Sequence, residues 1–454
     1  MDFESLSFPG APSVVTPPPG PASRKILELQ ARLESRAVSY PRGLPMAIRR
    51  GRGATVEDVD GNVFLDFFAG AGVLNLGHAN PDVLAAARAQ LEEVTHTLDI
   101  PTPARVSMLE ALREILPEEL GKLFFGGPTG SDAVEAAVKL AKYNTKRAPV
   151  LAFQGSYHGM TSGALSLCSG APFKEEFLPL IGEVHFAPYA YCYRCPFGRA
   201  PESCSLECGA YVENLLENPH SGVAPPAAIL VEPVQGEGGS VVPKDGFLQR
   251  IREACRRHGV VLIFDEIQAG FCRTGRMFSF QHFGVVPDVM TMSKALGGGG
   301  FPISALAFRE ELDTWPAGKH IGTFRGNMIA YAAGAAGIRF MLAHDVAGHA
   351  ARVGEILLGL LKEVETQSEI VGDARGKGLM LGAEMVEDKA TKKPAPELAR
   401  ALRSKLHRKG MLVEVGGHYF NVVRFLPPLV LTEAQARKGA EIFAEAVKEV
   451  ERER

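Results

Sequence analysis

The chain has 454 residues, of which 46% are hydrophobic and 22% are charged, and its formal net charge at pH 7 is −3. A chain of this length exceeds the size at which one hydrophobic core suffices, so two domains are expected. The near-neutral charge gives no basic field for nucleic acid, and no apolar run approaches the roughly 20 residues of a membrane span, so we expect a cytoplasmic protein with neither kind of partner.

The first residues, 1–24, are rich in proline and poor in large apolar side chains. Such a segment cannot bury enough surface to offset the entropy lost on ordering, so we predict a mobile, disordered tail. Residues 56–70 follow with two apolar runs separated by Asp60-Gly61, a turn sequence, and this pattern predicts a β-hairpin.

Residues 124–143 combine an apolar strand end, a glycine-rich turn and a helical pattern. Phe124 and Phe125 run into the turn from Gly126 to Ser131, after which apolar residues recur at helical spacing. Free backbone N–H groups and the helix dipole attract anions at such a turn, so it is a candidate phosphate site. The alternative is an ordinary turn in which Ser131 or Asp132 caps the helix.

Two further apolar runs end in polar residues. One is followed by Tyr157 and His158, and the other by Glu232 and a glycine-rich stretch. Taken alone, the tyrosine and histidine are typical of core packing, and the glutamate is typical of a turn cap. Their function therefore depends on what the rest of the chain places beside them.

Four of the seven cysteines form a C-x2-C-x8-C-x3-C pattern at Cys192, Cys195, Cys204 and Cys208. This spacing is acceptable for four thiolates around a zinc ion or an iron–sulfur cluster. An odd number of cysteines in a long chain argues against a secreted disulfide framework. The alternative to a metal site is a buried, reduced cluster, because cysteine is often buried without any ligand role.

The stretch from Val261 to Gly300 carries the most informative pattern. An apolar run ends at Asp265, and a second run, Val289 to Met292, leads to Lys294 and a run of glycines. Short apolar runs of this kind predict strands of a parallel sheet, and ligands gather at the carboxyl ends of such strands. A buried lysine and a carboxylate there suit Schiff-base chemistry, although a surface ion pair is the alternative.

This stretch resembles the signature of the class III aminotransferases, which depend on pyridoxal phosphate. The matching residues are Asp265-Glu266, Gln268, Gly270, Arg273-Thr274-Gly275, Pro287-Asp288, Ser293-Lys294 and Gly297 to Gly299. The resemblance implies that Lys294 forms the covalent bond to the cofactor and that Asp265 partners its pyridine nitrogen.

The resemblance also assigns the remaining cofactor and substrate contacts. It places Gly130 and Ser131 at the phosphate, Tyr157 and His158 beside the ring, and Gln268 near the phenolic oxygen. The resemblance further implies that Glu232 masks an active-site arginine and that Thr323 contacts the phosphate of the cofactor in a neighbouring subunit. It also implies that Arg325 and Arg375 bind the substrate, with Arg375 binding the substrate carboxylate.

The fold implied by the resemblance is α/β, of fold type I, and the protein is expected to be a homodimer with shared active sites. A large domain with a mostly parallel sheet is expected at residues 76–335. Residues 25–75 and 336–454 are expected to form a smaller α+β domain.

Two segments favour one branch of the family. Leu98 to Pro103 and Thr323 to Asn327 resemble the diaminobutyrate aminotransferases. The small-molecule amino donor and oxo acceptor expected from this resemblance are L-glutamate and aspartate 4-semialdehyde, which give L-2,4-diaminobutyrate and 2-oxoglutarate. The alternatives are another ω-aminotransferase of secondary metabolism, an amino-acid racemase or 2-epimerase, and a degenerate cofactor-binding scaffold.

Overall fold

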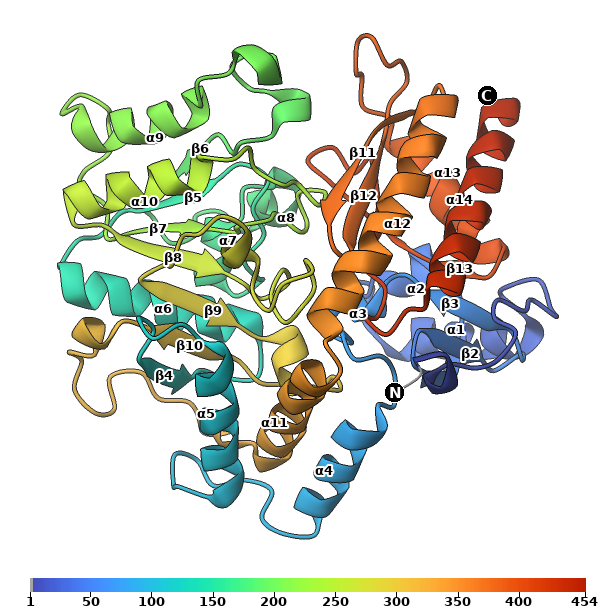
Figure 1. Ribbon diagram of the computed structural model, residues 1–454, viewed down its shortest axis with the longest axis horizontal. Helices are drawn as coiled ribbons and strands as arrows, with labels where there is room; N and C mark the ends of the chain where they lie inside the picture. Colours follow the sequence, from blue (N-terminus) through green and yellow to red (C-terminus); the bar gives the residue numbers. More distant parts are fainter. Residues whose placement is uncertain (1–2) are drawn as a thin grey trace.

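The computed structural model describes residues 3–454, which form a large lobe and a small lobe side by side (Figure 1). The large lobe contains a seven-stranded sheet of order β4-β10-β9-β8-β7-β5-β6. Strands β5 to β9 are parallel, whereas β10 is antiparallel to β4 and β9, so the mostly parallel sheet expected from the sequence is confirmed. The strands are β4 (Lys122–Phe125), β5 (Val150–Phe153), β6 (Val184–Ala187), β7 (Ala228–Val231), β8 (Val261–Asp265), β9 (Val289–Met292) and β10 (Ala305–Phe308).

Helices cover both faces of this sheet because its central strands are apolar on both sides. Ile263 of β8 packs in the core that contains α6, whereas Leu262 and Phe264 belong to the core that contains α10. Within the part of the chain that the structure describes, no helix is long and apolar enough to cross a membrane. The helices of this lobe are α4 (Pro81–Leu91), α5 (Pro103–Ile115), α6 (Gly130–Thr145), α7 (Ser162–Leu167), α8 (Ala171–Lys174), α9 (Glu207–Glu217), α10 (Phe247–His258) and α11 (Met328–Ala343).

The small lobe combines both ends of the chain. In its first sheet, of order β1-β2-β3-β13, the parallel pair β3–β13 joins an N-terminal strand to a C-terminal one. The hairpin predicted at residues 56–70 is present as the antiparallel pair β2–β3. Its second sheet has the order β11-β12-β15-β14. The strands are β1 (Ile48–Arg52), β2 (Thr55–Asp58), β3 (Val63–Asp66), β11 (Val371–Lys377), β12 (Met380–Met385), β13 (Met411–Leu412), β14 (Glu414–Gly416) and β15 (Val422–Phe425), and the helices are α1 (Pro21–Leu33), α2 (Tyr40–Gly43), α3 (Ala69–Gly72), α12 (Val346–Gln367), α13 (Pro396–Arg408) and α14 (Glu433–Glu453).

The N-terminal residues are ordered by contacts that their composition does not reveal. Of the predicted mobile tail, residues 1–2 lie outside the described residues, and the rest packs on the small lobe. Ser13 exchanges two backbone hydrogen bonds of 2.8 Å with Val63, and Asn62 Oδ1 accepts from the N–H groups of Val15 and Thr16. The prediction of a disordered tail is therefore wrong for residues 3–24, because the hairpin supplies acceptors for their extended backbone.

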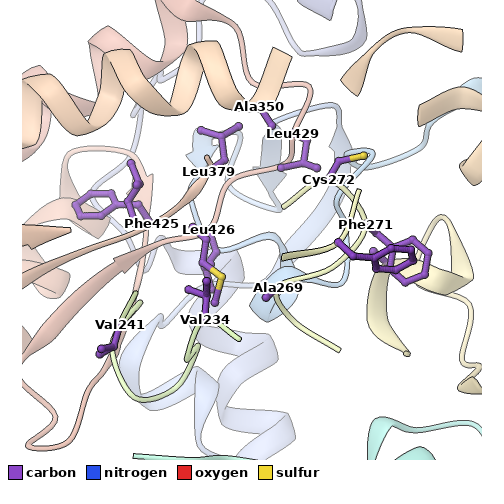
Figure 2. Packing of buried hydrophobic residues seen from close by; sticks show 14 of the residues in the cluster. Val234, Val241, Ala269, Phe271, Cys272, Ala350, Leu379, Phe425, Leu426 and Leu429 are labelled. Atoms are coloured by element: carbon purple, nitrogen blue, oxygen red, sulfur yellow. The ribbon is translucent and has the colours of Figure 1, made fainter. Parts of the chain in front are cut away.

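A continuous hydrophobic cluster fixes how the two lobes meet (Figure 2). Val234 and Phe271 of the large lobe and Phe425 and Leu426 of the small lobe are at most 1% exposed and belong to one core. Burying side chains of this size stabilises the folded state by about 1.5–3 kcal/mol each. Because Phe425 follows Arg424 directly, this packing also fixes where that arginine meets the large lobe.

Candidate active site

Strands β8 and β9 bring Asp265 and Lys294 to the same edge of the large sheet. The strands pair in parallel, with Asp265 opposite Thr291, and Lys294 follows the end of β9 with a φ of 49°. Both side chains line a cavity of about 490 Å³. Burial lowers the pKa of Lys294 to about 8, against the attraction of Asp265, so its neutral amine is accessible close to neutral pH.

Asp265 is held by groups from three directions. His158 Nδ1 lies 2.7 Å from Asp265 Oδ2, and Oδ1 accepts from the hydroxyl of Thr291 at 3.1 Å and from the N–H of Ile267 at 3.0 Å. Asp265 is 4% exposed, and His158 Nε2 is buried with no hydrogen-bond partner in residues 3–454. The carboxylate is thus fixed at the cavity wall in one orientation.

Glu232 ends β7 beside this pair and also lines the cavity. Its carboxyl accepts from the N–H groups of Tyr157 at 3.2 Å and Gly236 at 2.8 Å. Burial raises the pKa of Glu232 to about 7, an effect that nearby His158 opposes. The masking of an arginine that the sequence assigned to Glu232 is corrected by the structure, because the hydrogen bonds of this carboxyl go to backbone N–H groups and to no guanidinium.

The anion cradle lies at the start of α6, where Gly130 and Ser131 line the cavity. The first N–H groups of a helix lack acceptors within the helix, and the dipole there favours negative charge. A Cβ at Gly159 would lie 2.0 Å from Ser131 Oγ, and one at Gly130 would lie 3.0 Å from Ile267 Cδ1. The two glycines therefore allow the neighbouring loops to close around the cradle.

Tyr157 and Gln268 complete the walls of the cavity. The Tyr157 ring is half-buried and packs edge-on against Phe173, with centroids 5.8 Å apart. Gln268 Nε2 donates to Ala71 O at 3.0 Å, so a backbone carbonyl orients its amide. The structure thus brings together Gly130, Ser131, Tyr157, His158, Glu232, Asp265, Gln268 and Lys294, as the sequence predicted.

The sequence reasoning missed an arginine and a glutamate. Arg424, from β15, is 2% exposed, and its Nη2 lies 2.7 Å from Glu237 Oε2 at the cavity wall. Its Nη1 lies 3.5 Å from Gln268 Oε1, and its positive charge contributes to the lowered pKa of Lys294. A charged residue inside the apolar strand 422–425 is the signal that could have identified it, since buried arginines are rare unless paired.

Arg375 is not among the residues that line the cavity, and its predicted role in binding a substrate carboxylate stays a prediction. Its Nη1 donates to Asp373 at 2.8 Å and to Glu384 at 2.7 Å, and its Nε donates to Gly239 O at 3.0 Å. Both carboxylates also pair with other cations, Glu384 with Arg194 and Asp373 with Lys362, so Arg375 belongs to a wider ion-pair network. Arg375 pairs with carboxylates of its own lobe, whereas Arg424 pairs with Glu237, which lines the cavity.

Thr323 and Arg325 also lie outside the cavity of their own chain. Arg325 is buried and pairs with Asp99 at 2.6 Å, so it anchors the segment from Ile321 to Phe324. Thr323 is exposed, and its carbonyl oxygen lies 2.7 Å from His96 Nε2.

The four cysteines line one small cavity together with Lys244, but they do not form a metal centre. Within residues 3–454, no group of three or more histidine, cysteine, aspartate or glutamate side chains is arranged to hold a metal ion. Burial raises the pKa of Cys208 to about 11 and also raises the pKa of Cys192, so both groups are thiols near neutral pH. The predicted zinc or iron–sulfur site is therefore corrected to a cluster of free cysteines.

A lysine and an aspartate at adjacent parallel strand ends, beside an anion cradle at a helix start, define a pyridoxal-phosphate-dependent enzyme of fold type I. The family model "Aminotransferase class-III" matches residues 37–447. The chain belongs to the class III aminotransferases.

Individual relatives agree with this family assignment. The chain is 41% identical over 434 residues to the diaminobutyrate–2-oxoglutarate aminotransferase of Haemophilus influenzae, covering 94% of this chain and 95% of that protein. It is 35% identical over 448 residues to an alanine/serine racemase of Pyrococcus horikoshii, and the match covers 96% of this chain and 93% of the racemase. The ornithine aminotransferase structure from Toxoplasma gondii matches with a TM-score of 0.81 and 30% identity, covering 95% of this chain and 96% of that one.

Class III aminotransferases use pyridoxal 5′-phosphate, and the residues of the cavity fit this group. The cradle at Gly130 and Ser131 suits its phosphate, and the tight approach of Gly159 to Ser131 leaves no room for a side chain. The buried carboxylate of Asp265 suits a protonated ring nitrogen, and Lys294 supplies an amine for the aldehyde.

Proposed function

We propose that this aminotransferase transfers the amino group of L-glutamate to aspartate 4-semialdehyde, giving L-2,4-diaminobutyrate and 2-oxoglutarate, and that it also catalyses the reverse reaction. The observation that carries the substrate assignment is the 41% identity with the Haemophilus influenzae enzyme over nearly the full length of both chains. Leu98 to Pro103 and Thr323 to Asn327, which resemble that branch, support the same choice.

Lys294 is the group we assign to the chemical step. Pyridoxal phosphate, when bound, supplies an aldehyde that condenses with amines and a ring that accepts electrons. Once a substrate amine has taken the place of Lys294, Nζ is free to remove a proton from the substrate carbon and to return it as an acid. A pKa of about 8 suits both directions of proton transfer near neutral pH.

Asp265 and His158 are the groups we assign to the ring nitrogen. A carboxylate in a site from which water is largely excluded stabilises a nearby positive charge more strongly than it does in water. The 2.7 Å contact from His158 keeps Asp265 pointing at the cavity. Thr291 and Ile267 fix its second oxygen, so the carboxylate does not reorganise during turnover.

Arg424 is the group we assign to a substrate carboxylate. Its planar guanidinium can bind a carboxylate through two parallel hydrogen bonds. Glu237 holds that position in the structure, so glutamate or 2-oxoglutarate binds here by displacing the Glu237 carboxylate. An aldehyde or amine without a carboxylate at that distance leaves the Arg424–Glu237 pair intact.

A second subunit completes the proposed active site. Ile321 and Phe324 are 74% and 69% exposed, and Leu98 and Ile100 nearby are 48% and 65% exposed. Such a run of exposed apolar side chains suits burial against a partner surface. We propose a homodimer in which this segment carries Thr323 to the phosphate of the partner's cofactor.

A racemase reaction is the second candidate, supported by the 35% identity with the alanine/serine racemase. The same lysine serves both reactions, because each begins with removal of the proton on the substrate carbon. The decisive experiment incubates the holoenzyme with a panel of amino donors and oxo acceptors and follows the products by chiral chromatography. We expect L-2,4-diaminobutyrate from glutamate and the semialdehyde, whereas D-amino acids formed without any oxo acceptor contradict the proposal.

A further inference from the structure

A second polar cavity, of about 440 Å³, lies at the edge of the large sheet opposite the active site. Val261, the first residue of β8, lines it, and so does Asp288, which directly precedes β9. Asp265 and Lys294 stand at the other ends of these two strands. The cavity therefore has no part in the aminotransferase site described above.

Arginines dominate the walls of this cavity. Arg147, Arg252, Arg256 and Arg309 line it, against the two carboxylates of Asp288 and Glu311. One oxygen of Asp288 serves two guanidiniums, since Oδ1 lies 2.8 Å from Arg252 Nη1 and 3.0 Å from Arg309 Nε. Its other oxygen accepts from the N–H of Leu262 at 2.8 Å, so Asp288 has little capacity left to balance further positive charge.

Several guanidinium donors at the cavity are unused. Arg252 is 7% exposed, and its Nε is buried with no hydrogen-bond partner in residues 3–454. Within residues 3–454, the hydrogen bonds of the Arg147 guanidinium all come from Nη1, which donates to the carbonyls of Pro226, His258 and Gly259 at 3.0 to 3.3 Å. Arg147 therefore keeps donors at Nε and Nη2 for an anion in the cavity.

We infer that this cavity binds a small phosphate-bearing anion, at a site separate from the cofactor. Guanidinium groups pair with phosphate oxygens through parallel hydrogen bonds, and four of them converge here. The volume is ample for a phosphorylated metabolite but too small for a macromolecule. The bound anion pairs with the guanidinium groups that line the cavity and balances the surplus of positive charge around Asp288.

The test is titration calorimetry of the holoenzyme with pyrophosphate, inorganic phosphate and succinate at low salt. The holoenzyme is used because its active-site cradle is already filled by the cofactor phosphate. We expect saturable binding of pyrophosphate that weakens as sodium chloride is added, because salt shortens the distance over which exposed charges attract each other, to about 10 Å at 0.1 M. Succinate, a dianion without phosphate, is expected to bind more weakly, and equal binding overturns the phosphate assignment.

Two neighbouring arginines of α10 provide a matched comparison. Arg256 lines the cavity with its side chain 58% exposed, whereas Arg257 pairs with Glu213 and Glu217 and does not line it. We expect Arg256→Gln to weaken pyrophosphate binding about threefold, as for a partly screened charge. Arg309→Gln, which removes a less exposed group, is expected to weaken it about tenfold.

The Arg257→Gln variant is expected to bind pyrophosphate with the affinity of the wild type, because it loses the same charge as Arg256→Gln but at a position away from the cavity. Two results overturn the inference: no saturable binding of millimolar pyrophosphate to the wild type, or equal weakening by Arg256→Gln and Arg257→Gln. The unfolding temperature of each variant is measured alongside. Since Arg256 is exposed, its substitution is expected to leave folding intact even if Arg309→Gln does not.

Discussion

At the scale of single residues, burial sets the chemistry of the site. Lys294 and Asp265 attract each other, yet desolvation is the larger influence on the lysine and lowers its pKa to about 8. An exposed lysine has a pKa of about 10.4, so the protein shifts this group toward the range in which it acts as a nucleophile. The neutral amine predominates above pH 8, and the unreactive ammonium predominates below it.

The first prediction concerns the pH dependence of cofactor binding by the cofactor-free enzyme. Only the neutral amine of Lys294 attacks an aldehyde, so the rate of covalent reconstitution is expected to rise through a midpoint near pH 8 and then level off. Stopped-flow absorbance of the cofactor measures this rate. Lys294→Ala serves as the control and is expected to bind the cofactor without the covalent signal. A midpoint near pH 10 contradicts the burial argument.

The second prediction concerns the charge of Asp265. Asp265→Asn keeps the shape of the side chain but removes its negative charge, and we expect the half-reaction rate with glutamate to fall by about two to three orders of magnitude. The thermal midpoint is expected to change far less than the rate. Thr291→Val removes only the neutral 3.1 Å hydrogen bond to the same carboxylate and is expected to have a much smaller effect on the rate. Comparable losses of rate in the two variants mean that the charge of Asp265 does not stabilise the ring nitrogen.

At the scale of elements, the β2–β3 hairpin binds part of the N-terminal segment through hydrogen bonds. Asn62 is fully buried in that hairpin, and its side-chain oxygen accepts two backbone hydrogen bonds from the N-terminal segment. Its amide also donates to Asp58 at 2.8 Å. Hydrogen bonds from this turn, together with the burial of Phe3 in the core, therefore hold the N-terminal segment.

The third prediction tests this attachment. Asn62→Ala leaves the N–H groups of Val15 and Thr16 without an acceptor, at a cost of about 1–3 kcal/mol for each group that stays buried. We expect limited proteolysis to cut within residues 3–20 faster than in the wild type, while the cofactor absorbance is retained. Asn144→Ala, which removes an amide bonded to Leu140 and Leu312 in the large lobe, is the control and is expected to leave that cleavage rate unchanged. Equal rates for Asn62→Ala and wild type restore the mobile-tail prediction.

At the scale of the whole molecule, the active site spans both lobes and, in our proposal, two subunits. The predicted boundaries at residues 75 and 335 stay a prediction, but the shared core around Phe271 and Phe425 makes independent folding of the lobes unfavourable. Cofactor affinity and subunit association are expected to be linked, because a group that binds only the folded dimer stabilises it.

The fourth prediction tests the dimer. Phe324→Asp places a charge in the exposed apolar segment, and we expect sedimentation analysis to show monomers where the wild type sediments with twice the chain mass. Loss of the dimer is expected to lower the affinity for the cofactor as well, because Thr323 no longer reaches the partner's site. Tyr211→Asp changes another exposed aromatic residue, on α9, and is expected to remain dimeric. A monomeric wild type that binds the cofactor tightly contradicts the proposal.

The sequence by itself predicted the mostly parallel sheet and placed Gly130, Ser131, Asp265 and Lys294 just beyond strand ends or at a helix start, because each of these positions follows from a local apolar run and the residues that end it. Only the tertiary structure decided which arginine pairs with a residue of the cavity wall. Both arginines sit in strands of the small lobe. Arg375 pairs with Asp373 and Glu384, which are near it in the chain, whereas Arg424 pairs with Glu237 of the large lobe, a contact that no local pattern reveals. The local pattern of apolar residues fixes where a strand ends. The pairing of a buried arginine, the burial of the cysteine cluster and the ordering of residues 3–24 depend instead on which segments from elsewhere in the chain pack against them.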